Sequence, residues 1–256
     1  MANITSKDGT LIAFEQTGKG SPIIIVNGAL TDRNGGKSLA AELSEHFTVF
    51  IYDRRGRGES TDVQPYAVER EIEDIEALIR YAGGSACLFG GSSGGALSLQ
   101  AASKLGPSMI TKIALYETPY GQQKQDFDKQ KKEITELVKT GKPGDAAVYF
   151  LSQIGTPPEA LEEMKNSPQW ETIKKIDFTL VYDYLVLGDG AIPQTKVKNI
   201  SVPVLVMDGE HAADFIRASA DELAHLIPDA KRKILKGQTH QADNEVLVPV
   251  LVEFFS

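Results

Sequence analysis

One stretch of the sequence decides how the fold is interpreted: Leu88-Phe89-Gly90-Gly91-Ser92-Ser93-Gly94-Gly95-Ala96. A short apolar run precedes the glycines, and small residues suited to a helix follow them. A serine between small residues at a strand-to-helix turn is typical of a nucleophile elbow, in which a tight turn raises the hydroxyl above the edge of a sheet. Backbone N–H groups at the start of the helix favour negative charge there. The stretch therefore predicts a serine nucleophile.

The pattern G-x-S-x-G fits this stretch in two registers. Residues 90–94 nominate Ser92, and residues 91–95 nominate Ser93. We prefer Ser92, because a strand ending at Phe89 then leads into the turn and a Gly-Gly-Ala step follows for close helix packing; Ser93 stays open as the alternative. A dinucleotide loop would need G-x-G-x-x-G with an acidic residue roughly 20 positions later. Here the glycines come in pairs around two serines and no P-loop lysine follows, so a phosphate loop is excluded.

Short apolar runs alternate with helical patterns on both sides of this stretch, which is the signature of βαβ units. A branched apolar run without alternation, as at residues 23–26, is typical of a parallel strand buried on both faces. The sequence predicts strands at residues 4–6, 11–16, 23–26, 48–52, 86–89, 113–116, 204–207 and 232–235. Helices are expected at residues 68–79, 96–105, 215–226 and 246–255. The expected fold class is α/β, with a mostly parallel central sheet flanked by helices.

This alternation stops after Thr118 and resumes near Val204. The residues between are polar at first, then contain several prolines and helical apolar patterns. We interpret residues 118–201 as a helical cap inserted after the sixth strand, and residues 1–117 and 202–256 as one core domain. A helical extension without a role at the active site is the alternative. Within this region Trp170, Phe150, Tyr182 and Tyr184 are candidate pocket residues, with ordinary core packing as the competing interpretation.

His240 is the expected general base among the four histidines. It follows a predicted strand and the turn at residues 236–239, and it precedes the last predicted helix. In a doubly wound sheet such a loop lies at the same carboxyl edge as Ser92. His211 also follows a strand at this edge, whereas His46 and His225 are expected at the surface.

Four motifs in order resemble those of the α/β-hydrolase superfamily across essentially the whole chain. Val26-Asn27-Gly28-Ala29 is similar to its His-Gly step after the third strand, and Tyr52-Asp53-Arg54-Arg55-Gly56-Arg57-Gly58-Glu59-Ser60 to its Y-D-x-R-G-x-G-x-S loop. Residues 90–95 are similar to its elbow, and residues 237–240 to its histidine loop. The resemblance implies an α/β-hydrolase fold and an oxyanion hole made by the backbone N–H groups of Ala29 and Ser93. Asn27 departs from the histidine that the family usually has, which could alter the shape of this loop.

The carboxylate of the implied Ser-His-acid triad is the open assignment. Such a carboxylate fixes the imidazole tautomer and stabilises the imidazolium. Relatives often place it after the next-to-last strand in a pattern like G-E-x-D, where this chain has Gly209-Glu210-His211-Ala212. Other relatives place it after the sixth strand, where this chain offers Glu117. We favour Glu117; Asp214, Asp208 and a site without a working acid remain alternatives.

The predicted function is therefore hydrolysis of an ester or related acyl bond of a small molecule through an acyl-enzyme. The same fold could run another triad reaction, such as thioester or C–C hydrolysis, a lyase reaction or cofactor-free perhydrolysis. A non-catalytic small-molecule receptor is the second alternative, which Asn27 and Ala212 favour and the intact serine–histidine pair opposes. Neither a metal nor an organic cofactor is expected, since His, Cys and Asp do not cluster at metal-ligand spacing.

Composition narrows the expected partners and location. The 256-residue chain has a net charge of -8 and no basic cluster, so nucleic acid is not an expected partner. No apolar run approaches the roughly 20 residues of a membrane helix, and the N-terminus lacks the pattern of a secretory signal. The one cysteine, Cys87, lies in an apolar run and is expected to be buried. We expect a cytoplasmic monomer or homodimer with a small-molecule substrate.

Overall fold

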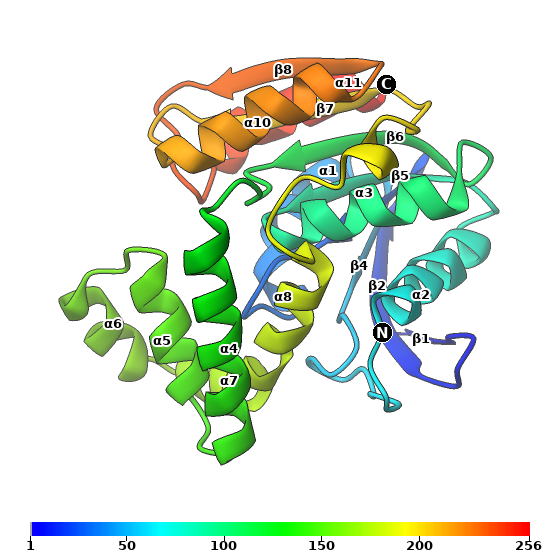
Figure 1. Ribbon diagram of the computed structural model, residues 1–256. Coiled ribbons are helices and arrows are strands. Elements are labelled where there is room, and N and C mark those ends of the chain that lie inside the picture. The colour runs from blue at the N-terminus through cyan, green and yellow to red at the C-terminus, as the bar shows by residue number, and fades with distance from the viewer. Residues whose placement is uncertain (1) are drawn as a thin grey trace.

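A computed structural model describes residues 2–256, which contain one eight-stranded sheet (Figure 1). The strands are β1 (Ala2–Thr5), β2 (Leu11–Gly18), β3 (Pro22–Val26), β4 (Thr48–Tyr52), β5 (Ala86–Gly91), β6 (Ile110–Tyr116), β7 (Val204–Gly209) and β8 (Ala230–Leu235). Their order across the sheet is β1-β2-β4-β3-β5-β6-β7-β8. β2 pairs antiparallel with β1 and β4, and the remaining neighbours pair in parallel. The predicted mostly parallel α/β sheet is confirmed.

Helices cover both faces of this sheet. They are α1 (Lys37–Leu43), α2 (Val68–Tyr81), α3 (Ser93–Leu105), α10 (Asp214–Leu226) and α11 (Asn244–Phe255), with a 3-10 turn, η1 (Arg33–Gly36), before α1. Because side chains alternate along a strand, Ile24 of β3 packs into the core that includes α2 and α3, and Ile23 into the core that includes α1 and α11. Cys87 is buried in the second core, as expected. A strand of β-branched residues such as β3 is thus covered on both faces.

Some element boundaries differ from those expected. β5 continues to Gly91, two residues past the predicted end at Phe89, because Gly90 and Gly91 still pair with β6 although they extend no apolar pattern. α3 accordingly begins at Ser93 and not at Ala96. The short helix α1 was not predicted. Among the described helices, none combines the length and apolarity needed to cross a membrane.

A run of helices lies between β6 and β7, and we call residues 118–201 the helical segment. Its helices are α4 (Lys124–Thr140), α5 (Asp145–Gln153), α6 (Pro158–Lys165), α7 (Gln169–Ile176), α8 (Leu180–Leu187) and α9 (Gln194–Val197), with the 3-10 turn η2 (Asp177–Thr179) before α8. In Figure 1, α4 to α7 stand to one side of the sheet, and α8 lies between α4 and α3. Trp170 packs in a small apolar cluster whose buried members all come from this segment, and Tyr182 and Tyr184 of α8 are buried. The division into a core domain and a cap domain stays a prediction.

The loop after β4 contains three buried arginines, Arg54, Arg55 and Arg57. Arg54 donates through Nε and Nη2 to the two carboxylate oxygens of Glu71 on α2, each at 2.7 Å. Arg55 donates in the same way to Asp74, at 2.8 and 2.7 Å. Buried charges persist only when they are paired. Ion pairs therefore fix the 53–60 loop against α2.

Glu71 is ionised in this setting. Burial alone would raise its pKa, but the neighbouring Arg54 guanidinium outweighs burial and holds the pKa below its ordinary value of 4.5. A carboxyl group whose pKa is lowered by folding stabilises the protein above its unfolded-state pKa. That stabilisation is lost as the pH falls, because the unfolded chain takes up the proton first.

Acid unfolding should reveal this contribution. We expect the free energy of unfolding of the wild type to decline as the pH falls from about 5 to about 3. Glu71→Gln should be about 3 kcal/mol less stable at pH 7, because Arg54 loses a buried partner, and should decline less steeply. Urea denaturation between these pH values measures both effects.

The control for this experiment is Glu76→Gln, also on α2, whose partner Arg80 is largely exposed. Surface ion pairs contribute little, so this variant should follow the wild type. Identical pH dependence of the wild type and Glu71→Gln would contradict the assignment.

Candidate active site

Ser92 is the residue that joins β5 to α3. Its φ of +53° and ψ of -128° lie in a region that residues with a side chain avoid. Its N–H donates to the carbonyl oxygen of Tyr116 at 2.9 Å, and its own carbonyl accepts from the N–H of Gly95 at 2.9 Å. The turn is therefore held from both sides, by the end of β6 and by the first turn of α3.

Glycines let neighbouring backbone come close to this serine. A Cβ atom added at Gly28 would lie 3.0 Å from the Cβ of Ser92. A Cβ atom at Gly94 would collide with the carbonyl oxygen of Val26, at the end of β3. The loop after β3 and the start of α3 thus flank Ser92, which places Ala29 in the loop beside it.

The two candidate serines differ in their surroundings. Ser93 is 2% exposed, and its Oγ donates to Oδ1 of Asp183 on α8 at 2.7 Å. Ser92 is half-buried at the head of the turn. A hydroxyl that is buried and bound to a carboxylate is poorly placed to attack a substrate, so the geometry favours Ser92.

The His240 ring contacts the carboxylate of Glu117. Nδ1 of His240 lies 2.6 Å from Oε2 of Glu117, and Oε1 accepts from the N–H of Gly209 at 3.0 Å. The Glu117 side chain is 2% exposed and that of His240 is 54% exposed. A carboxylate at Nδ1 holds the proton there and leaves Nε2 to accept one from a nucleophile.

Tyr116, the last residue of β6, connects these parts. Its carbonyl oxygen accepts from Ser92, and its hydroxyl donates to the carbonyl oxygen of Thr239, next to His240. Burial, followed by the nearby Glu117 carboxylate, raises the pKa of Tyr116, so the hydroxyl keeps its proton as a donor. The ends of β5 and β6 and the loop after β8 therefore meet at one edge of the sheet.

The alternative acids lie elsewhere. Asp208 of β7 is fully buried, and its Oδ1 is 2.5 Å from Nη1 of Arg232 on β8. Asp214 is exposed at the start of α10. Among residues 2–256, the carboxylate that contacts the His240 ring is that of Glu117.

The remaining histidines do not share this arrangement. His211 is exposed, and its backbone N–H donates to the carbonyl oxygen of Gln238 at 2.9 Å. His46 and His225 are exposed, as expected. His211 therefore contributes its backbone to the shape of the histidine loop.

The loop after β3 is held by side chains from two directions. Nδ2 of Asn27 donates to the carbonyl oxygen of Asp32 at 3.0 Å, which closes the loop on itself. Arg57 donates through Nη1 to the carbonyl oxygens of Gly28 and, at 3.2 Å, Thr31. Asn27, the departure from the family pattern, thus has a local role as a donor to backbone.

Sequence reasoning missed Asp183, which accepts hydrogen bonds from Arg54 and Arg57. Its signal was a lone carboxylate within the apolar run of α8, Leu-Val-Tyr-Asp-Tyr-Leu-Val-Leu. A charge in such a run must be paired when it is buried. The partners could not be named, because they lie more than a hundred residues earlier in the chain.

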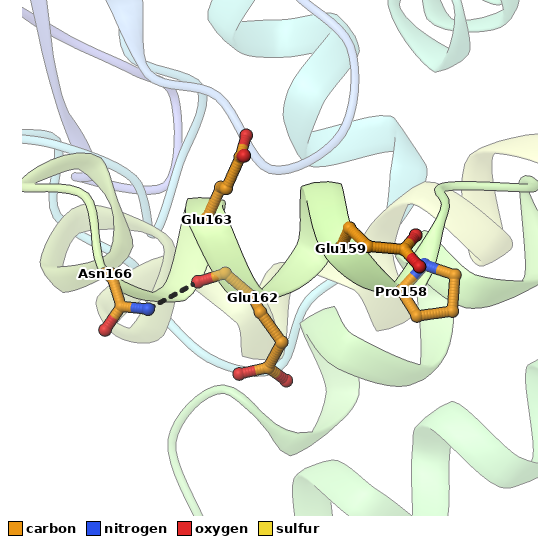
Figure 2. A pocket seen from close by; sticks show the side chains of 5 residues that line it. All are labelled: Pro158, Glu159, Glu162, Glu163 and Asn166. Carbon is orange, nitrogen blue, oxygen red and sulfur yellow. Dashed lines mark hydrogen bonds between the residues drawn. The ribbon is translucent and has the colours of Figure 1, made fainter.

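A hollow of about 630 Å³ lies along α6 and its C-terminal end. Its lining residues, drawn in Figure 2, are Pro158, Glu159, Glu162, Glu163 and Asn166. The carboxylates of Glu162 and Glu163 point to opposite sides of the helix. The lining comes from α6 and the residue that follows it, and includes neither Ser92 nor His240. Within residues 2–256, no group of three or more His, Cys, Asp or Glu side chains is placed to hold a metal ion.

Comparisons with known proteins agree with this fold. An alpha/beta hydrolase from Sphaerobacter thermophilus is 45% identical, with 100% of both chains covered and a TM-score of 0.91. An uncharacterized hydrolase of Bacillus subtilis, YraK, is 31% identical over 106 residues, which cover 38% of this chain and 39% of that protein. An esterase from Exiguobacterium antarcticum is 19% identical, with 99% and 98% of the two chains covered and a TM-score of 0.79. At 19% identity, the similarity to this esterase shows the fold alone.

The sequence profile of the Alpha/beta hydrolase family matches residues 23–246, most of the chain. The resemblance seen in the motifs is thereby confirmed, and it extends from β3 into α11. The chain belongs to the alpha/beta hydrolase family and is a hydrolase.

Proposed function

We propose that this hydrolase is a serine esterase, which cleaves an ester or related acyl bond of a small molecule. The observation that carries the proposal is the contact of 2.6 Å between Nδ1 of His240 and the buried carboxylate of Glu117, at the sheet edge where Ser92 stands. A buried carboxylate paired with a half-exposed imidazole is the orienting half of a triad. Ser92, on its strained turn, is the candidate third member.

In the proposed reaction, Ser92 Oγ attacks the substrate carbonyl carbon while Nε2 of His240 takes the hydroxyl proton. The backbone N–H groups of Ala29 and Ser93 hold the oxyanion of the tetrahedral intermediate. The intermediate collapses, the leaving alcohol takes the proton from His240, and an acyl-enzyme remains. Water, activated by His240, then releases the acid and restores Ser92.

The imidazole has to approach Ser92 for the first proton transfer. Among residues 2–256, the hydrogen-bond partner of the His240 ring is Glu117. Catalytic hydrogen bonds to a nucleophile often tighten only when substrate is bound, to about 3 Å between heavy atoms. The exposed position of His240 leaves the ring able to make this movement.

The helical segment is proposed to set the choice of substrate. Val148 and Phe150 of α5 pack, half-buried, in the same apolar cluster as Leu30, which follows Ala29. This cluster places apolar side chains next to the proposed oxyanion loop. An uncharged substrate with an apolar acyl group fits these surroundings better than a charged one.

Turnover of p-nitrophenyl esters with acyl chains from acetyl to decanoyl tests the nucleophile. We expect the wild type to hydrolyse members of this panel and Ser92→Ala to lower kcat by at least about 10⁴-fold, since the reaction loses its attacking group. Wild-type turnover by Ser92→Ala would contradict the assignment. No turnover by the wild type on any ester would contradict the esterase proposal.

Replacement of Glu117 tests the acid. Glu117→Gln should lower kcat by about 10³–10⁴-fold with little change in KM, because the amide favours the wrong imidazole tautomer. The control is Asp214→Asn, which removes the exposed carboxylate of α10 and should leave kcat unchanged. The reverse result, an inactive Asp214→Asn and an active Glu117→Gln, would show that the acid is misassigned.

A further inference from the structure

We propose that Asp183, on α8 of the helical segment, is a positioning residue that orients both N–H donors of the oxyanion hole. The inference rests on the proposed esterase function, in which those donors belong to Ala29 and Ser93. The buried carboxylate of Asp183 is linked to one donor through the side chain of Ser93 and to the other through Arg57.

The Asp183 carboxylate accepts three hydrogen bonds, all from residues next to the proposed reaction centre. Oδ1 accepts from Oγ of Ser93 and from Nη1 of Arg54, each at 2.7 Å. Oδ2 accepts from Nη2 of Arg57 at 2.8 Å. The side chain is almost fully buried, so water does not compete for these bonds.

The first donor is tied through the side chain of Ser93. Ser93 begins α3 directly after Ser92, and its N–H is the donor that follows the nucleophile. The bond from its Oγ to Asp183 fixes the side-chain rotamer and the first turn of the helix. Asp183 therefore limits how far this N–H can move.

The second donor is tied through a peptide plane. Nη1 of Arg57 donates to the carbonyl oxygen of Gly28, and this C=O shares one planar trans peptide with the N–H of Ala29. Fixing the direction of the carbonyl therefore fixes the direction of the N–H, which points the opposite way. Arg57 has a rigid, planar guanidinium, and Asp183 accepts a hydrogen bond from its Nη2.

Charge makes Asp183 hard to replace. Within residues 2–256, the carboxylate bonded to Arg57 is that of Asp183, whereas Arg54 is also bonded to Glu71. Burial alone would raise the pKa of Asp183, but Arg57 and Arg54 outweigh it and lower the pKa, so the group is an anion. An amide in place of the Asp183 carboxylate would turn its NH₂ group either toward Arg57 or toward Ser93 and Arg54, which are themselves donors. In both cases Arg57 would lose its negatively charged partner.

The expected kinetic signature is a loss in kcat. The oxyanion exists only in the transition state and the tetrahedral intermediate, so misdirected donors weaken binding of these states and leave substrate binding intact. A residue needed only for folding would instead change the melting temperature and leave kcat per folded molecule unaltered.

A matched control is available in the same motif. Asp74 forms a buried, two-bond pair with Arg55, the residue between Arg54 and Gly56. Arg55 bonds otherwise to Asp8 and to the carbonyl oxygen of Arg70, both outside the 27–31 loop. Asp74→Asn therefore disturbs a buried arginine–carboxylate pair as Asp183→Asn does, without touching either donor.

The experiment compares wild type, Asp183→Asn, Ser93→Ala, Asp74→Asn and Ser92→Ala on p-nitrophenyl butyrate, with melting temperatures measured in parallel. We expect Asp183→Asn to lower kcat by about 30–100-fold with KM within about 3-fold, and Ser93→Ala to lower kcat by about 5–10-fold. Asp74→Asn should lose thermal stability and keep kcat within about 2-fold. Inhibition by butylboronic acid, which forms a tetrahedral adduct on serine, should weaken in parallel with kcat.

Several outcomes would overturn the proposal. Wild-type kcat in Ser93→Ala would do so, and this variant also serves if Asp183→Asn fails to fold. An equal loss of kcat in Asp183→Asn and Asp74→Asn would do so as well. A wild type without turnover on any ester of the acetyl-to-decanoyl panel, or an active Ser92→Ala, would overturn the proposed function and this inference together. An active wild type with an inert Ser92→Ala and an unimpaired Asp183→Asn would overturn this inference alone.

Discussion

The backbone conformation of Ser92 is the constraint on which the rest of the structure depends. A φ of +53° at a residue with a side chain costs about 1–3 kcal/mol, and it persists only where the surroundings impose it. β5 and β6 supply that restraint through the bond from Ser92 to Tyr116, and α3 supplies it through the bond from Gly95. The parallel sheet therefore holds the Ser92 hydroxyl at its edge. Glu117 directly follows β6, the strand whose last residue, Tyr116, bonds to Ser92.

A second layer of restraint is electrostatic. Arg54 and Arg57 carry two buried positive charges, and Glu71 and Asp183 supply two negative ones from α2 and α8. These bonds join the sheet, the helical segment and the loop after β3. The groups that stabilise the junction are thus the same groups that would set the geometry of the oxyanion hole.

Sequence patterns could predict the sheet, the elbow and the histidine loop. Short apolar runs between helical patterns, and small residues around a serine, have local physical causes. The acid stayed open between Glu117, Asp208 and Asp214, since sequence does not show which strand end faces the histidine loop. The predicted strand ends were wrong where backbone pairing continues beyond the apolar side-chain pattern, as at Gly90 and Gly91 of β5. Asp183 was missed because its bond to Arg57 spans 126 residues.

Mapping of a covalent phosphonate adduct tests the central claim, that the hydroxyl of Ser92 is the nucleophile. The protein would be inactivated with a p-nitrophenyl alkylphosphonate, digested, and its peptides sequenced by mass spectrometry. The account predicts one adduct per chain, on Ser92, with loss of esterase activity in proportion to labelling and no adduct in Ser92→Ala. An adduct on Ser93, or full inactivation without modification of Ser92, would contradict it.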